Sequence, residues 1–230
     1  MYPTPQEQAV IAAAEKIMLD TMARYDPSHD NYHVRRVRKT ALAIARSLPT
    51  QPDLLVVELA ALFHDVLDKK YVTPAEAEDP YSYFLPFFTS MASAHGLDLV
   101  NDGRAELVSR IVSNVSWTTE KKLREQDLWS RWHEACVELH CVQDADRLDA
   151  IGAFGVMRCA AYSTVTNRPL HTPTDDAAHP NTAIQHFYDK LLHIHDRLKT
   201  DPGRILGEKR HKVLVDFLDS VEDESNVLIP

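Results

Sequence analysis

The chain has 230 residues, of which 44% are hydrophobic, and it contains 13 prolines and only 6 glycines. This length is enough for one domain with a substantial core, and the low glycine count argues against a barrel or sandwich built on many tight turns. The formal net charge of −9 leaves no broad basic surface, so nucleic-acid polymers and anionic membranes are not expected partners. A small anion can still bind where a nearby cation or metal ion makes the local electrostatic potential positive.

The cysteines and the first residues bear on the cellular compartment. Cys136, Cys141 and Cys159 form no Cys-x-x-Cys pair and are odd in number, so we interpret them as small buried side chains in a reducing environment. The N-terminal residues show no basic-then-apolar leader, and the longest apolar run is shorter than the roughly 20 residues of a membrane span. We expect a cytoplasmic protein, with nuclear access left open.

In the first third of the chain, the hydrophobic period predicts successive helices and no strand alternation. One helix is expected over residues 5–24. A second begins after the cap residue Asp30 and stops before Pro49. A third begins at Asp53 and consists of an almost uninterrupted apolar run from Leu54 to Leu67. Because this run offers no polar face to water, it is expected to be a buried central helix.

The rest of the chain is also expected to be helical, so the predicted fold class is an all-α, single-domain bundle over residues 1–230. A helical stretch opens near Thr73 and Pro74, is broken by Pro80 and Pro86, and ends at Gly96. Residues 163–180 read as a long loop of the kind that often serves binding. The remaining helices are expected over residues 104–115, 129–151, 181–199 and 203–222.

A histidine and an aspartate are neighbours in the most hydrophobic segment of the chain. Burying His64 and Asp65 is costly unless they have a partner, and a metal ion is the partner that this pair favours. Neighbouring helical residues point about 100° apart, so both can bind one ion only near the end of the helix. His33 lies at the edge of the apolar stripe of the second helix. The alternative is a helix C-terminus at which His64 complements the helix dipole and Asp65 forms a turn.

A third segment adds carboxylates. Residues 143–150 place Asp144, Asp146 and Asp149 within two helical turns, flanked by apolar residues that leave little room for a fully solvated face. A solvated acidic face is the alternative interpretation of this segment. Helical phase puts Asp144, together with Leu148 and Ile151, on the inward face.

Taken together, these segments resemble the HD-domain superfamily of metal-dependent phosphohydrolases, whose signature is His…His-Asp…Asp on a helical fold. The segments LFHDVLDK (residues 62–69) and DADRLDAIGA (residues 144–153) more closely resemble a bacterial and fungal branch that includes nucleoside triphosphate pyrophosphohydrolases. The resemblance covers about residues 28–219. It implies a helical HD-domain bundle and a divalent metal held by His33, His64, Asp65 and Asp146. Asp144, which helical phase favours, is the substitute for Asp146.

The residues around the expected metal also have expected roles. Imidazole and carboxylate ligands leave Mn, Fe, Ni, Co, Zn and Mg open. Asp68 is expected to orient or deprotonate the attacking water, and Lys69 next to it is the second expected catalytic residue. The expected phosphate contacts are Arg36, Arg147 and Lys190, because an acidic protein needs local cations there. For each of these cations the alternative is an ordinary surface charge.

The expected function is hydrolysis of a nucleoside or deoxynucleoside triphosphate to the monophosphate and pyrophosphate. Two alternatives remain at the level of sequence: a nucleotide phosphomonoesterase of the same superfamily, and a regulatory module that binds a nucleotide without turnover. In each case the expected partner is a nucleotide or another small phosphate ester. Exposed terminal helices leave a homodimer open.

Overall fold

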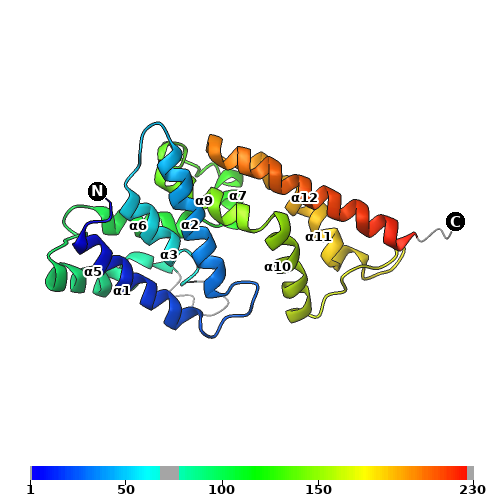
Figure 1. Ribbon diagram of the computed structural model, residues 1–230, viewed down its shortest axis with the longest axis horizontal. Helices are drawn as coiled ribbons and strands as arrows, with labels where there is room; N and C mark the ends of the chain where they lie inside the picture. Colours follow the sequence, from blue (N-terminus) through cyan, green and yellow to red (C-terminus); the bar gives the residue numbers. More distant parts are fainter. Residues whose placement is uncertain (1, 68–77, 227–230) are drawn as a thin grey trace. The chain divides into compact units, whose positions relative to one another are not determined.

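The computed structural model describes residues 2–67 and 78–226, which are helical and contain no strand, so the expected all-α fold is confirmed (Figure 1). The chain divides into two compact units. The first comprises residues 1–25 and 29–145, and the second comprises residues 26–28 and 146–230. The boundary falls inside one continuous helix, between Ala145 and Asp146.

The first unit contains seven complete helices among its described residues and the first part of an eighth. They are α1 (Pro5–Met22), α2 (Asn31–Ser47), α3 (Leu54–Phe63), α5 (Pro80–His95), α6 (Arg104–Asn114), α7 (Trp117–Glu125), α8 (Arg131–Ala135) and α9 (Val137–Asp149). The second unit takes the end of α9 and continues with α10 (Gly152–Val165), α11 (Ala183–Asp189), α12 (Asp201–Ser225) and the 3-10 turns η1 (His179–Asn181), η2 (Leu191–His193) and η3 (His195–Arg197).

Helix α3 is the central helix of the first unit. All ten of its residues are buried, and it contacts α1, α2 and α6 (Figure 1). Its start is fixed by Asp53, whose side chain accepts hydrogen bonds from the backbone N–H groups of Leu55 at 2.9 Å and Val56 at 3.2 Å. A helix without a polar face is stable only where neighbours cover it on every side, and the sequence prediction of a buried central helix is therefore confirmed.

The predicted cap and stop of the second helix, and the predicted end of the later helix at Gly96, also hold. Asp30 caps α2 by accepting from the backbone N–H of His33 at 2.9 Å, and α2 ends before Pro49. Thr4 and Glu7 form a reciprocal capping box at the start of α1. Gly96 ends α5 in the left-handed conformation, with φ of 67°.

Several predicted helix boundaries were wrong. The expected single helix over residues 129–151 is two helices, α8 and α9, because the backbone of Cys136 is extended between them. The segment between the helices expected over residues 104–115 and 129–151 contains the unpredicted helix α7. Pro80 and Pro86 do not break a helix: Pro80 lies in the first turn of α5, where its missing N–H costs nothing, and Pro86 lies inside the same helix.

The loop and the last helices also differ from the prediction. Residues 152–165, the last of which were expected to open the long loop, form α10, so the loop begins later. The helix expected over residues 181–199 is broken into α11, η2 and η3, and the last helix runs from Asp201 to Ser225. The predicted helical start near Thr73 lies outside the described residues.

In the second unit, an arginine clamp holds the turn between α9 and α10. Arg158 of α10 pairs with the buried carboxylate of Asp149 at 3.2 Å and donates to the carbonyl of Ser28 at 2.7 Å. The chain turns at Gly152, whose φ is +75°, and α10 begins there. Removing one partner of a buried pair leaves an uncompensated charge, so this clamp is expected to fix the turn firmly.

Gly155 provides a test of how tightly this turn is packed. A Cβ at this position would overlap the carbonyl oxygen of Ala150, which belongs to the backbone and cannot move away cheaply. We therefore expect Gly155→Ala to lower the free energy of unfolding by about 2–3 kcal/mol. The control is Ala153→Ser at an exposed site on the same helix, which should change it by less than about 0.5 kcal/mol. Denaturant unfolding measures both, and equal stability of the two variants would contradict the packing.

The three cysteines behave as the sequence predicts. Cys136 and Cys141 are buried and Cys159 is half-buried, and all three are free thiols. Burial raises the pKa of Cys136 to about 11 and that of Cys141 to about 12, so neither forms a reactive thiolate near neutral pH.

Among the described residues, none of the helices combines the length and the apolar character that crossing a membrane requires.

Candidate metal centre

Three predicted ligands of the first unit converge at the start of α2 and the end of α3. The Nε2 atoms of His33 and His64 lie 3.3 Å apart. The Oδ2 atom of Asp65 lies 3.4 Å from Nε2 of His33 and 3.5 Å from Nε2 of His64. The three atoms therefore form a nearly equilateral triangle, which is called the ligand triangle below.

The end of α3 positions His64 and Asp65. The helix stops at Phe63, whose ring stacks on Phe84 with centroids 4.3 Å apart and meets Phe87 edge-on. The backbone N–H of Val66 then donates to the carbonyl of Phe63 and closes a turn. His64 and Asp65 thus lie in a turn at the end of the helix, which is where the sequence predicts that both can reach one ion.

The hydrogen bond at the other ring nitrogen fixes the tautomer of His64. Its Nδ1 atom lies 2.8 Å from the carbonyl oxygen of Ala61, which only accepts, so Nδ1 carries the proton. The lone pair of Nε2 is therefore left on the side of the ligand triangle. This is the arrangement of a metal-binding histidine, in which a backbone carbonyl orients the ring from behind.

Burial and charge also favour a cation at the ligand triangle. The side chains of His33 and His64 are 1% and 2% exposed, whereas that of Asp65 is 21% exposed and gives the triangle one side open to solvent. Burial by itself would raise the pKa of Asp65, but the neighbouring His64 and His33 rings outweigh it and hold the pKa well below its usual range. Asp65 is therefore an ionised carboxylate, as metal binding requires.

The dimensions of the ligand triangle fit one divalent ion. Neighbouring ligands of a tetrahedral or octahedral ion at about 2.1 Å lie about 3.0–3.4 Å from one another. The three measured separations are 3.3, 3.4 and 3.5 Å. These three atoms would hold the ion together and would leave coordination positions for a further ligand, water or substrate.

The other predicted site residues fall into three groups. Arg36 lies one turn after His33 on α2 and is half-buried. Asp68 and Lys69 lie outside the described residues. Asp146, Arg147 and Lys190 belong to the second unit, and their predicted roles stay predictions.

Within α9, the three acids differ in burial. Asp144 is fully buried and Asp149 is buried against Arg158, whereas Asp146 is partly exposed. The helix is regular until Asp149, so the bend at Gly152 comes after both Asp144 and Asp146 and does not disturb their helical phase. Arg147 is 4% exposed, and its Nη1 donates to the carbonyl of Arg197 at 2.8 Å, so part of its hydrogen-bonding capacity holds η3.

One residue next to the ligand triangle was missed by the sequence prediction. The ring of His29 meets that of His33 edge-on with centroids 6.1 Å apart, and its charge helps to lower the pKa of Asp65. The one sequence feature that points to His29 is its spacing of four residues from His33, which on a helix would place both side chains on the same face. His29 precedes the cap of α2, however, where helical spacing gives no guide to side-chain position.

The chain is similar to known proteins along most of its length. Residues 31–151 match the HD domain family. The protein YpgQ of Bacillus subtilis is 31% identical over 201 residues, which cover 85% of this chain and 84% of YpgQ. The crystal structure of YpgQ in complex with ADP matches with a TM-score of 0.69 at 26% identity, and the match covers 95% of this chain and 96% of YpgQ.

Two further solved structures are similar along nearly the whole chain. The Lin1889 protein of Listeria innocua matches with a TM-score of 0.72 at 29% identity over 97% of this chain and 99% of Lin1889. An HD-superfamily hydrolase from Bacillus thuringiensis matches with a TM-score of 0.70 at 26% identity over 96% of this chain and all of the hydrolase chain. The family match spans more than half of the chain and includes the ligand triangle, so the chain belongs to the HD domain family.

Proposed function

We propose that this protein is a divalent-metal-dependent phosphohydrolase that converts nucleoside or deoxynucleoside triphosphates to the monophosphate and pyrophosphate. The observation that carries the proposal is the ligand triangle of His33, His64 and Asp65, whose atoms lie 3.3–3.5 Å apart in largely buried surroundings that keep one side open. The membership of the chain in the HD domain family supports the reaction class. The complex of the relative YpgQ with ADP supports a nucleotide as the ligand.

The residues of the chain fit a metal ion in the following way. His33, His64 and Asp65 would hold the ion, and we propose Asp146 as the fourth ligand, as the resemblance implies. When bound, a divalent ion supplies a lowered pKa for a coordinated water and neutralises the charge of phosphoryl oxygens. Two imidazoles and two carboxylates suit Mn, Fe, Ni, Co, Zn or Mg, and the ligand set does not choose among them.

The chain itself supplies positioning for this reaction. The Ala61 carbonyl fixes the ring of His64, and the Asp30 cap together with burial fixes His33, so the ligand atoms are preorganised before substrate arrives. Phosphoryl transfer needs alignment of the attacking and leaving oxygens and cations near the phosphates more than covalent chemistry.

The predicted catalytic and substrate-binding residues complete the proposal. Asp68 is proposed to orient or deprotonate the attacking water, and Lys69 to assist beside it. The proposed phosphate contacts are Arg36, Arg147 and Lys190. A guanidinium contacts two phosphate oxygens at once and so fixes the orientation of the group, whereas the ammonium of a lysine acts as a point charge.

The experiment that tests this function resolves the products of hydrolysis. Protein stripped of metal is incubated with a panel of nucleoside mono- and triphosphates, with and without Mn or Mg, and pyrophosphate is separated from phosphate. We expect pyrophosphate and monophosphate, formed only with added metal. The Asp65→Ala variant is the control for a contaminating hydrolase and should form neither product.

Other outcomes of this experiment would each support a different function. Phosphate released from monophosphates would replace the proposal with a phosphomonoesterase of the same superfamily. Binding of nucleotides without any product under either metal would replace it with a regulatory binding module. Product formed equally well without metal would contradict the proposed role of the ligand triangle.

A further inference from the structure

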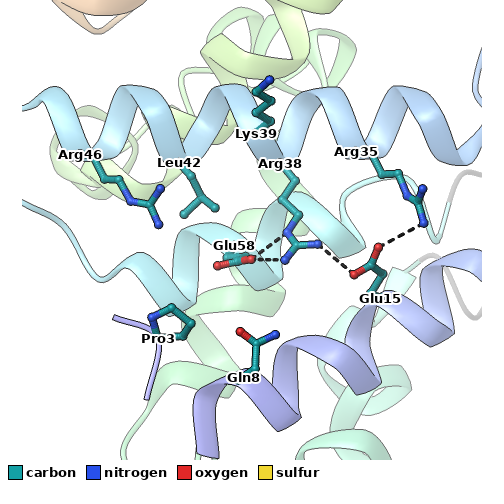
Figure 2. A pocket seen from close by; sticks show the side chains of 9 residues that line it. All are labelled: Pro3, Gln8, Glu15, Arg35, Arg38, Lys39, Leu42, Arg46 and Glu58. Atoms are coloured by element: carbon teal, nitrogen blue, oxygen red, sulfur yellow. Dashed lines mark hydrogen bonds and ion pairs between the residues drawn. The ribbon is translucent and has the colours of Figure 1, made fainter. Parts of the chain in front are cut away.

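A groove of about 580 Å³ lies on the first unit, between α1, α2 and the start of the chain (Figure 2). It is lined by Pro3, Gln8, Glu15, Arg35, Arg38, Lys39, Leu42, Arg46 and Glu58. None of these residues belongs to the ligand triangle or to the predicted substrate contacts. The volume is within the range of about 300–1,000 Å³ that small-molecule sites occupy.

The groove and the ligand triangle lie on opposite faces of α2. Leu42, which lines the groove, comes nine residues after His33, and nine residues are about two and a half turns of an α-helix. A half-turn places the two side chains on opposite sides of the helix axis. A molecule in the groove is therefore separated from the ligand triangle by the body of α2.

The charge of the groove is opposite to that of the whole chain. Four cations and two carboxylates line it, an excess of two positive charges on a protein with a formal net charge of −9. An exposed cationic stripe on an acidic protein attracts small anions rather than long anionic polymers, because the surrounding surface repels a polymer.

The two carboxylates of the groove are already neutralised by two of its arginines. Arg38 donates from Nε to Glu58 at 2.7 Å and from Nη1 to Glu15 at 3.0 Å, and Nη2 of Arg35 lies 3.3 Å from Glu15 (Figure 2). Tyr2 donates to the buried Glu58 as well. Burial, and after it this hydrogen bond, raises the pKa of the Tyr2 phenol well above its ordinary value, so the phenol keeps its proton.

This network leaves two cations for a ligand. Lys39 and Arg46 are both exposed, and within residues 2–67 and 78–226 neither has an ion-pair partner. Arg46 and Leu42 point from α2 toward Pro3 and Glu58, and Lys39, which also lines the groove two turns before Arg46, extends from the other side of α2 in this view (Figure 2). Pro3 and Leu42 offer an apolar wall, and the Gln8 amide of α1 offers a donor and an acceptor.

We propose that this groove is a second binding site, separate from the metal centre, for a small molecule that carries a phosphate chain. Arg46 and Lys39 hold the phosphate oxygens, and Arg38 stays fixed beneath them by Glu58 and Glu15. The apolar wall of Pro3 and Leu42 accommodates the rest of the molecule. The cations, and not a metal ion, supply the attraction, so binding is independent of divalent metal.

The test uses the full-length protein after the metal has been removed and the chelator dialysed away. Tripolyphosphate is titrated in a calorimeter as the probe, because it carries the phosphate chain and nothing else. We expect binding by the metal-free protein that weakens as sodium chloride rises from about 50 to about 300 mM. The double variant Lys39→Ala/Arg46→Ala should bind about tenfold more weakly or worse.

Two controls separate binding in the groove from general charge attraction and from binding at the metal centre. The double variant Lys122→Ala/Arg131→Ala removes the same charge from exposed residues of α7 and α8 and should bind tripolyphosphate within about twofold of the unmodified protein. His33→Ala alters the ligand triangle and should leave metal-free binding intact. Unchanged binding by the Lys39/Arg46 variant, or no binding by the unmodified protein, would overturn the proposal. The proposed hydrolase activity would be untouched by that result.

Discussion

Asp65→Ala is expected to remove divalent metal and hydrolytic activity together while the helical fold persists. Asp65 supplies one of the three atoms of the ligand triangle and the only one that is 21% exposed, on the side where substrate would enter. Its loss should weaken metal binding by at least about 100-fold. Activity should fall by about 1,000-fold, which corresponds to roughly 4 kcal/mol of transition-state stabilisation.

Metal content after dialysis, pyrophosphate release and the helical circular dichroism spectrum measure this prediction. Asp20→Ala is the matched control, because Asp20 is an exposed aspartate that pairs with Lys16 on the surface of α1. It should keep both metal and activity. Full activity in Asp65→Ala would show that the ligand triangle is not the catalytic metal centre.

The second large effect concerns the two acids of α9. Asp146→Asn should release the metal and abolish activity, because an amide lacks the negative charge of the proposed fourth ligand. Asp144→Asn should instead lower the free energy of unfolding by about 1–3 kcal/mol and leave the metal in place, because Asp144 is fully buried inside the helix bundle. The two variants change the same atoms two residues apart, so each serves as the control for the other.

Metal content and thermal unfolding of both variants distinguish the two roles. Helical phase favoured Asp144 as the inward residue, and its complete burial agrees with that phase. Asp146, which the resemblance selects as the ligand, is partly exposed. If only Asp144→Asn loses its metal, the assignment of Asp146 is wrong.

The helices of the first unit that the sequence predicts well are those whose ends are decided locally. Asp30 and Asp53 cap α2 and α3 with their own side chains, and Pro49 follows α2 directly. The central position of α3 follows from its composition, since Glu58 is its only charged residue and a helix without a polar face has to be covered. Local chemistry and tertiary packing agree in these segments.

The break between α8 and α9 depends on contacts that are distant in sequence. His133 of α8 bonds to Asn114 at 3.1 Å, and Gln143 of α9 donates to the carbonyl of Asn114 at 2.7 Å. His140 also bonds to the carbonyl of His133 at 2.7 Å across the break. Hydrogen bonds to one residue of α6 thus position both helices on either side of Cys136, and the local sequence does not predict these contacts.

At Pro86 tertiary packing preserves a helix that the sequence predicts to be broken. Proline in a helix interior removes one hydrogen bond and crowds the preceding turn. Pro86 is exposed, whereas Phe84, Phe87 and Phe88 of the same helix are buried. Burial of three aromatic side chains is worth several kcal/mol and outweighs a local cost of about 3 kcal/mol.

The candidate site was predictable to the extent that its residues stand in a recognisable order. His64 and Asp65 stand out as polar residues in apolar surroundings, the resemblance added His33, and these three converge. His29 was missed because it lies before a helix cap. The groove on the other side of α2 was missed because its cations resemble an ordinary solvated helix face until Glu15 and Glu58 are seen to neutralise two of them.

The most direct test of the metal centre is a crystal structure of the protein with bound Mn, with the ion located by its anomalous scattering. We predict one peak within about 2.4 Å of Nε2 of His33, Nε2 of His64 and Oδ2 of Asp65, with a carboxylate oxygen of Asp146 as a further ligand. A peak elsewhere, or no peak at the ligand triangle under conditions that support hydrolysis, would contradict the assignment of these residues as the metal centre.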